Sequence, residues 1–220
     1  MRRRQAASPR APRKGGTSGL PPRQECRPPD LEDLRVIEEG ARRTLLALGE
    51  DPSRQGLEKT PGRVARSLKE LTAGYWQDVD RIINNALFDV DYSEMVVVKD
   101  IVFYSLCEHH LLPFFGKATV GYVPDKKIVG LSKIPKIVQV FARRLQVQER
   151  MTLEIAHTLE RKLKPKGVGV VIRARHLCME MRGAQSQLSP TVTSALLGAF
   201  RSDARTREEF LTLARRPDSQ

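Results

Sequence analysis

The chain has 220 residues, of which 40% are hydrophobic and 29% charged, and it carries a formal net charge of +12. This length suits one domain with an extension, and no run of apolar residues approaches the ~20 needed to cross a bilayer, which excludes a membrane-spanning protein. The basic excess suits a polyanionic ligand, such as a nucleotide triphosphate, a nucleic acid or an anionic surface, and does not choose among them.

The first 30 residues are expected to form a disordered basic tail. They contain eight basic and two acidic residues, six prolines and three glycines, with no apolar periodicity. Such a segment cannot bury enough apolar surface to offset its chain entropy. The Arg-rich start is not followed by an apolar stretch, so a secretory signal is not expected and the protein is expected to be cytoplasmic.

A helical extension is expected over residues 31–92. Apolar side chains recur there at helical spacing, and Gly49 suits the end of a helix. Thr60 before Pro61 is typical of an N-cap followed by the first helical residue. The expected helices run from Leu31 to Gly49, from Thr60 to about Ala73, and from Asp78 to Leu87.

The apolar pattern changes over residues 93–220, which are expected to form the main domain. Stretches rich in Val, Ile, Phe and Tyr predict strands, and Ser132 is expected to cap the first of two helices between them. The order β-β-α-α-β-β predicts an α+β fold with an antiparallel sheet and helices on one face. The expected strands are Met95–Ser105, Gly116–Val123, Val168–Met179 and Thr191–Phe200, and the helices are Ser132–Leu145, Gln148–Leu163 and Thr206–Arg215.

Cysteine and histidine residues cluster at two places in the main domain. If the chain turns with helical pitch after Cys107, that residue and His110 share a face, while His109 points elsewhere. On the strand expected further along, His176 and Cys178 share a face because side chains alternate. Two thiolates and one imidazole suit zinc, and three protein ligands leave a fourth position for water, as in catalytic sites.

The spacing alone leaves three interpretations open. The cluster could hold a catalytic zinc ion, or a structural zinc ion, which usually takes four ligands. It could also hold no metal, because buried free cysteines are common as small hydrophobic residues.

At these residues the sequence resembles the GTP cyclohydrolase I family. The motifs occur in family order, and the resemblance covers about Leu31 to Arg216. The segments that carry it are Lys59–Ala65, Cys107–Gly116, Gly130–Lys133, Arg144–Arg150, His176–Gly183 and Thr206–Leu211.

The resemblance implies a tunnelling fold (T-fold) and a homodecamer with active sites at subunit interfaces. It implies that the enzyme uses Zn²⁺ to convert GTP into 7,8-dihydroneopterin triphosphate and formate, the first step toward folate or tetrahydrobiopterin. The implied zinc ligands are Cys107, His110 and Cys178. Zinc lowers the pKa of bound water to about 7, which supplies hydroxide to open the imidazole ring of guanine.

The resemblance also assigns the remaining site residues. His109 and His176 are the implied acid–base groups, Ser132 assists at the ribose, Glu149 binds guanine and Gln148 is a further guanine contact. A carboxylate at position 149 accepts two N–H bonds from guanine and rejects adenine. The implied phosphate-binding residues are Arg63, Lys133, Lys136 and Arg182; at position 136 the family favours arginine, and lysine lacks its bidentate fork.

Two other functions remain open from the sequence. One is a T-fold relative that acts on a different purine or pterin. The other is a basic nucleic-acid-binding protein with structural zinc, which the Arg-rich tail favours. The chain has few aromatic residues and no known nucleic-acid motif, so neither nucleic acid nor membrane is expected as a partner.

Overall fold

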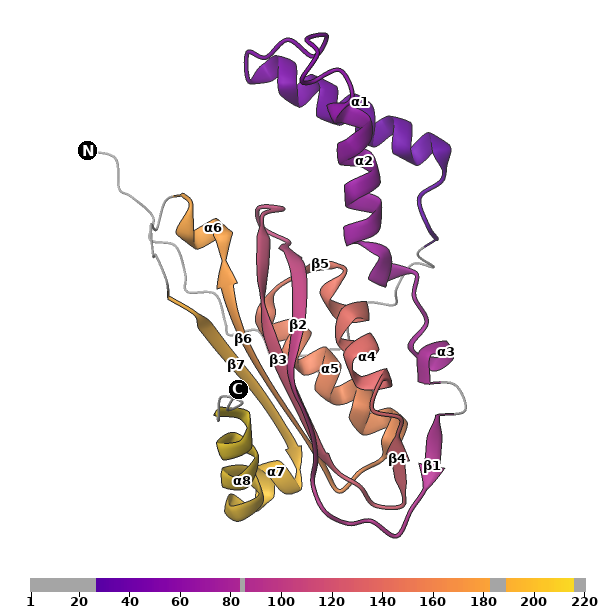
Figure 1. The fold of residues 1–220 in the computed structure, drawn as a ribbon, viewed down its shortest axis with the longest axis vertical. Helices are drawn as coiled ribbons and strands as arrows, with labels where there is room; N and C mark the ends of the chain where they lie inside the picture. Colours follow the sequence, from indigo (N-terminus) through magenta and orange to yellow (C-terminus); the bar gives the residue numbers. More distant parts are fainter. Residues whose placement is uncertain (1–26, 84–85, 183–188, 216–220) are drawn as a thin grey trace, which may run out of the picture.

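The computed structural model describes residues 27–83, 86–182 and 189–215, which form an α+β fold around one five-stranded sheet (Figure 1). The strand order is β5-β2-β3-β6-β7, and every neighbouring pair is antiparallel except β2 and β5. Along the chain, the four long strands and the two helices between them follow the predicted β-β-α-α-β-β order, which is therefore confirmed. The strands are β2 Val96–Cys107, β3 Pro113–Val123, β5 Leu145–Gln146, β6 Gly167–His176 and β7 Thr191–Gly198.

The strand register brings three chain segments together at one end of the sheet. Ser105 near the end of β2 pairs with Phe114 at the start of β3. Phe114 pairs in turn with His176, the last residue of β6. The loop after β2 and the segment after β6 consequently start side by side, although about 70 residues separate them in sequence.

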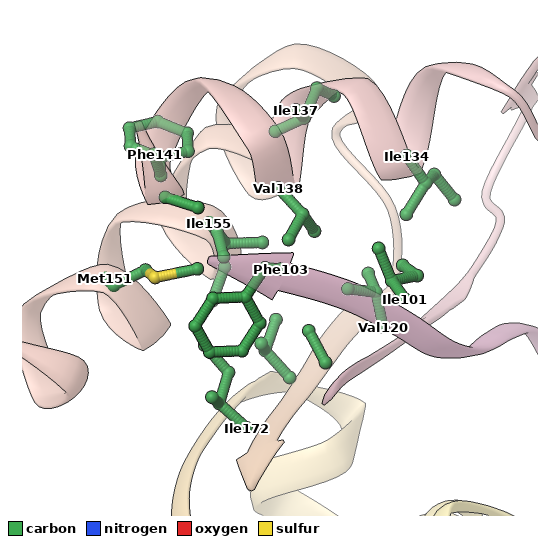
Figure 2. Close-up of a cluster of buried hydrophobic side chains, with 14 of the residues drawn as sticks. Ile101, Phe103, Val120, Ile134, Ile137, Val138, Phe141, Met151, Ile155 and Ile172 are labelled. Atoms are coloured by element: carbon green, nitrogen blue, oxygen red, sulfur yellow. The ribbon is translucent and has the colours of Figure 1, made fainter. Parts of the chain in front are cut away.

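Two helices cover one face of the sheet and enclose the core. These are α4, Lys133–Ala142, and α5, Gln148–Leu163. Apolar side chains of both helices interlock with those of the central strands in Figure 2, where Phe103 lies at the centre of the cluster. Its ring packs edge-on against Phe114 at 5.9 Å between centroids, a favoured aromatic geometry.

The C-terminal helices lie against the opposite face. They are α7, Ala199–Ser202, and α8, Ala204–Arg215, and the second buries the ring of Phe210. That ring approaches Gly121 and Gly169, which pair across β3 and β6. A Cβ atom on either glycine would stand within 2.8 Å of the ring, so the packing requires both glycines.

The N-terminal helices project beyond the sheet (Figure 1). Helix α1 has no buried residue and is capped by Asp30, whose carboxylate accepts from two backbone N–H groups. The prediction that Thr60 caps α2 is wrong, because Lys59 precedes the helix and Thr60 is its first residue. The elements here are α1 Leu31–Ala47, α2 Thr60–Leu71, a 3₁₀ turn Ala73–Tyr75, α3 Val79–Ile83 and β1 Leu87–Asp89.

Other expectations need correction. Strand β6 ends at His176, because β3 and β7 provide no partner beyond that point, and Cys178 lies in the short helix α6, Leu177–Glu180. Ser132 precedes α4 but its side chain makes no capping hydrogen bond. Strands β1 and β4, Lys127–Val129, form a two-stranded ribbon that the sequence did not predict. No helix in the described residues is long and apolar enough to cross a membrane.

Candidate active site

The loop that follows β2 forms a single helical turn. The carbonyl of Cys107 accepts from the N–H groups of His110 and Leu111, at 3.3 and 2.8 Å, and Leu111 adopts a left-handed conformation with φ 55° that ends the turn. This is the pitch expected from the sequence. Cys107 and His110 therefore face the same side, and the Cys107 Sγ lies 3.8 Å from the His110 Nδ1.

Cys178 reaches the same place from the end of β6. Helix α6 turns it away from the strand direction, and an ion pair between Arg175 and Glu180 ties the strand end to this helix with two hydrogen bonds of 2.9 and 2.6 Å. Such bidentate pairs fix geometry as well as adding energy. The predicted meeting of Cys178 with the loop is thus achieved by a helix instead of by strand alternation.

The three predicted ligands come together. The ligand atoms of Cys107, His110 and Cys178 all lie within 4.8 Å of one another. Burial, and then the neighbouring Cys107 thiol, raise the pKa of the Cys178 thiol above its ordinary value. A divalent cation would compensate for placing two thiolates together, so this set of two sulfurs and one imidazole nitrogen fits zinc.

His109 does not point away from the cluster as expected. Its Nδ1 lies 3.9 Å from the Cys107 Sγ, while its Nε2 lies 3.9 Å from a carboxylate oxygen of Glu108. The side chain of His109 is 64% exposed, so its ring is open to solvent and to a ligand.

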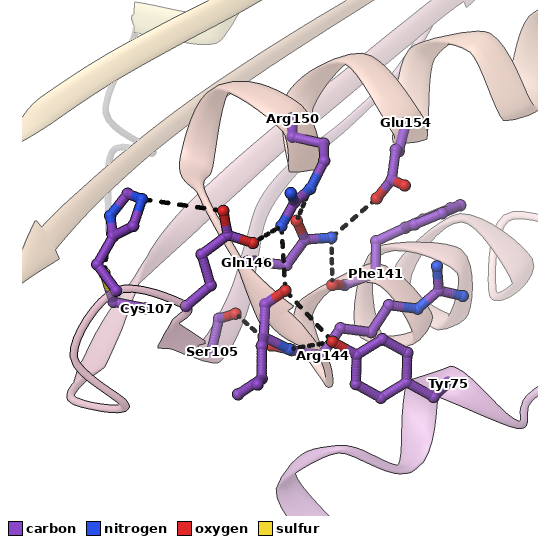
Figure 3. A network of polar contacts seen from close by, with 11 residues as sticks. Tyr75, Ser105, Cys107, Phe141, Arg144, Gln146, Arg150 and Glu154 are labelled. Carbon is purple, nitrogen blue, oxygen red and sulfur yellow. Dashed lines mark hydrogen bonds and ion pairs between the residues drawn. The ribbon is translucent and has the colours of Figure 1, made fainter. Parts of the chain in front are cut away.

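Glu108 attaches the metal loop to α5 through Arg150 (Figure 3). The Arg150 guanidinium donates to this carboxylate, to the side-chain oxygen of Gln146 at 3.0 Å, and to the Leu145 carbonyl at 3.1 Å. The hydrogen bond to Glu108 raises the pKa of Arg150. The network holds the loop that carries Cys107 against the start of α5, where the predicted guanine-binding residues lie.

His176 is held on both its face and its edge. The ring stacks on Phe114 with the planes parallel and the centroids 4.7 Å apart. Its Nε2 lies 2.8 Å from the side-chain oxygen of Gln148. Burial lowers the pKa of His176, and the carboxylates of Glu149 and Glu180 act in the opposite direction.

Helix α5 begins with the two residues predicted to contact guanine, and they differ in accessibility. Gln148 is 1% exposed, and its amide hydrogen bonds to β6 and β7. Glu149 is exposed in the first turn of α5, where the helix dipole favours a carboxylate. Glu149 is therefore open to a ligand, whereas Gln148 faces the protein interior.

The predicted phosphate-binding residues divide into separate groups. Arg182 is exposed close to Cys178, whose pKa it influences, and belongs to the metal end of the sheet. Arg63 is exposed on α2, in the projecting N-terminal helices. Lys133 and Lys136 lie in the first turn of α4, directly after Ser132.

The start of α4 is remote from the metal cluster within one chain. Gln139 on this helix donates to the Val102 carbonyl of β2 at 2.7 Å. From Val102 to Cys107 the strand rises roughly 17 Å, and from Gln139 back to Lys133 the helix rises roughly 9 Å in the other direction. One chain thus places the metal ligands and the lysines of α4 roughly 25 Å apart.

The sequence indicated no role for three side chains that shape the site. Glu108 and Arg150 lie 42 residues apart, and Phe114 lies 62 residues before the ring that it stacks on. All three lie in or beside the motifs quoted above. No local spacing rule relates such distant residues, and only the strand register reveals their pairing.

Comparison with known proteins identifies one family over most of the chain. The family model described as GTP cyclohydrolase I matches residues 37–215, which include every predicted site residue. A GTP cyclohydrolase 1 from Campylobacter jejuni subsp. jejuni (strain 81-176) is 57% identical over 179 residues, covering 81% of this chain and 94% of the relative.

Relatives from two other organisms are similar to nearly the same degree. The GTP cyclohydrolase 1 of Synechococcus sp. (strain JA-3-3Ab) is 55% identical over 193 residues, covering 87% of this chain and 84% of the relative. The GTP cyclohydrolase 1 of Rattus norvegicus is 56% identical over 171 residues, covering 78% of this chain and 71% of the relative.

Proposed function

The chain belongs to the GTP cyclohydrolase I family, and from this membership we propose that it hydrolyses GTP to 7,8-dihydroneopterin triphosphate and formate. The observation that carries the proposal is the convergence of two thiols and one imidazole within 4.8 Å, inside the region that matches the family. Its product would lead toward folate or tetrahydrobiopterin, and we place the enzyme in the cytoplasm.

Cys107, His110 and Cys178 would hold the zinc ion. When bound there, zinc supplies Lewis-acid activation of water at neutral pH. The ion pair of Arg175 with Glu180 would keep Cys178 in place. A set of three protein ligands is typical of catalytic zinc sites, whereas structural zinc sites usually have four.

His176 and His109 would exchange protons with the substrate. Imidazole is the side chain that gains and loses a proton most readily near neutral pH. His176 is fixed by Phe114 and Gln148, which suits a group that must meet one atom of the substrate repeatedly. His109 is more exposed and flanks the ligand Cys107, so it would serve steps at the purine ring.

Glu149 would recognise guanine, because its exposed carboxylate can accept from the ring N–H and the amino group together. Arg182, Arg63, Lys133 and Lys136 would bind the triphosphate, and Ser132 would assist at the ribose. Since the lysines of α4 lie roughly 25 Å from the metal ligands of their own chain, we propose that a neighbouring subunit supplies them. A homodecamer provides such interfaces, and the exposed apolar residues of α1 are available for them.

Zinc content measured together with formate release tests the proposal. We expect about one zinc ion per chain, and a fluorescent pterin from GTP after oxidation. Cys178→Ala should lose zinc and activity together, while Cys26→Ala, outside the residues that match the family, should keep both. His176→Ala should keep zinc and lower kcat by about 10²- to 10⁴-fold.

Two results would contradict this function. One is full formate release by Cys178→Ala after its metal has been removed. The other is equal turnover of GTP and ATP, because Glu149 can pair with guanine and not with adenine.

A further inference from the structure

The amide of Gln148 is buried and has all its hydrogen-bonding groups occupied. Its Nε2 lies 3.1 Å from each of three acceptors, which are the Ile172 carbonyl, the Thr191 carbonyl and the Thr193 hydroxyl. Its Oε1 lies 2.8 Å from the His176 Nε2. With 1% of the residue exposed, Gln148 connects α5, β6 and β7 below the surface of the site.

These neighbours fix which way the amide points. The carbonyls of Ile172 and Thr191 only accept hydrogen bonds, so the amide must direct its NH₂ group toward them. The reverse orientation would place the amide oxygen against two carbonyl oxygens, neither of which can donate a hydrogen bond to it. The Gln148 Oε1 therefore faces His176.

Thr193 is consistent with this orientation. The Thr152 hydroxyl donates its hydrogen to the backbone carbonyl of Gln148 at 2.7 Å. It therefore accepts from the Thr193 hydroxyl, which lies 2.7 Å away. Thr193 then retains a lone pair for the amide of Gln148. The donors and acceptors around the amide thus form one consistent set.

The orientation of the amide decides where the proton of His176 resides. An amide oxygen can only accept, so the His176 Nε2 must carry a hydrogen in the neutral ring as well as in the charged ring. The Nδ1 is then the nitrogen without a hydrogen in the neutral ring. The stack on Phe114 prevents the ring from tilting away from this hydrogen bond.

We propose that Gln148 is a positioning residue that holds His176 in its Nε2–H tautomer, which leaves Nδ1 as the nitrogen without a hydrogen in the neutral ring. The functional part of this proposal rests on the acid–base role proposed above for His176. It assigns Gln148 to the histidine rather than to direct contact with guanine, in agreement with its burial.

The test combines Gln148→Met, which keeps the length of the side chain and removes both hydrogen-bonding groups, with ¹⁵N NMR of labelled histidine. The wild-type His176 signal, assigned by its loss in His176→Ala, should show the Nε2–H tautomer. Gln148→Met should show both tautomers, keep its zinc, and lower kcat by about 10- to 100-fold with little change in KM.

Gln148→Glu keeps an acceptor for the His176 N–H, so it should retain the Nε2–H tautomer and a higher kcat than Gln148→Met. Gln139→Met removes a similar amide that bonds to β2 far from the metal cluster, and it should change neither tautomer nor kcat. In the His176→Ala background, Gln148→Met should lower kcat no further, because both residues would act through the same ring.

Two results would overturn the proposal. One is an unchanged tautomer in folded Gln148→Met, and the other is an equal loss of kcat from this substitution with and without His176. Full activity of His176→Ala would instead refute the acid–base role, and the tautomer measurement would still decide whether Gln148 controls the ring.

Discussion

The separation of the metal cluster from the start of α4 predicts that two inactive variants restore activity to each other. Cys178→Ala removes a metal ligand, and the double variant Lys133→Ala/Lys136→Ala removes the proposed phosphate contacts. If each active site takes metal ligands from one chain and lysines from its neighbour, some mixed interfaces contain no altered residue. With random assembly from equal amounts, about one quarter of the sites would be intact.

Co-expression of the two variants with different affinity tags, followed by sequential purification on both tags, isolates the mixed assemblies. Formate release per chain should approach about a quarter of the wild-type rate, whereas each variant purified alone should be nearly inactive. Activity of the mixed assemblies no higher than that of the separate variants would refute the shared site. It would mean that one chain provides both groups, in spite of their separation of roughly 25 Å.

Three further predictions concern stability and metal binding. In urea unfolding, Gly169→Ala should destabilise the fold by about 1–3 kcal/mol, because the added methyl group would clash with Phe210. Gly40→Ala should be neutral or stabilising, because Gly40 lies in α1 with open space around it. Arg150→Gln should weaken zinc binding by about 10- to 100-fold in chelator competition, while Arg43→Gln, which removes an exposed ion pair, should leave it unchanged. Burial raises the pKa of Tyr122 in the folded chain, so as pH rises the unfolded chain releases this proton first. The free energy of unfolding should therefore fall as pH rises above about 10. Tyr122→Phe should reduce that fall in unfolding curves measured at alkaline pH.

The sequence predicted the long, strongly patterned elements well. Helix α5 runs from Gln148 to Leu163 as expected, and β2 and β3 differ from expectation only at their ends. These elements bury a continuous apolar face, which fixes both their type and their approximate limits. The short strands β1, β4 and β5 were missed, because strands of two or three residues take their structure from their neighbours.

The candidate metal site was predicted from residue types, and part of the supporting geometry was predicted wrongly. Cys107 and His110 meet through a local turn, which sequence spacing can indicate. Cys178 joins them because β6 ends where its partner strands end, and that depends on the register of the whole sheet. The contact between Gln148 and His176 depends on the same register, so residue spacing could not reveal it.

The contact of Phe210 with Gly121 and Gly169 has a consequence for sequence divergence. The two glycines lie opposite each other on neighbouring strands, and one aromatic ring occupies the space above both. A larger residue at position 121 or 169 can be accommodated only if the residue at position 210 is smaller than phenylalanine. A smaller residue at position 210 leaves a void unless one of the two strand positions carries a larger side chain. The three positions should therefore covary among homologues, because together they form the contact between α8 and the sheet.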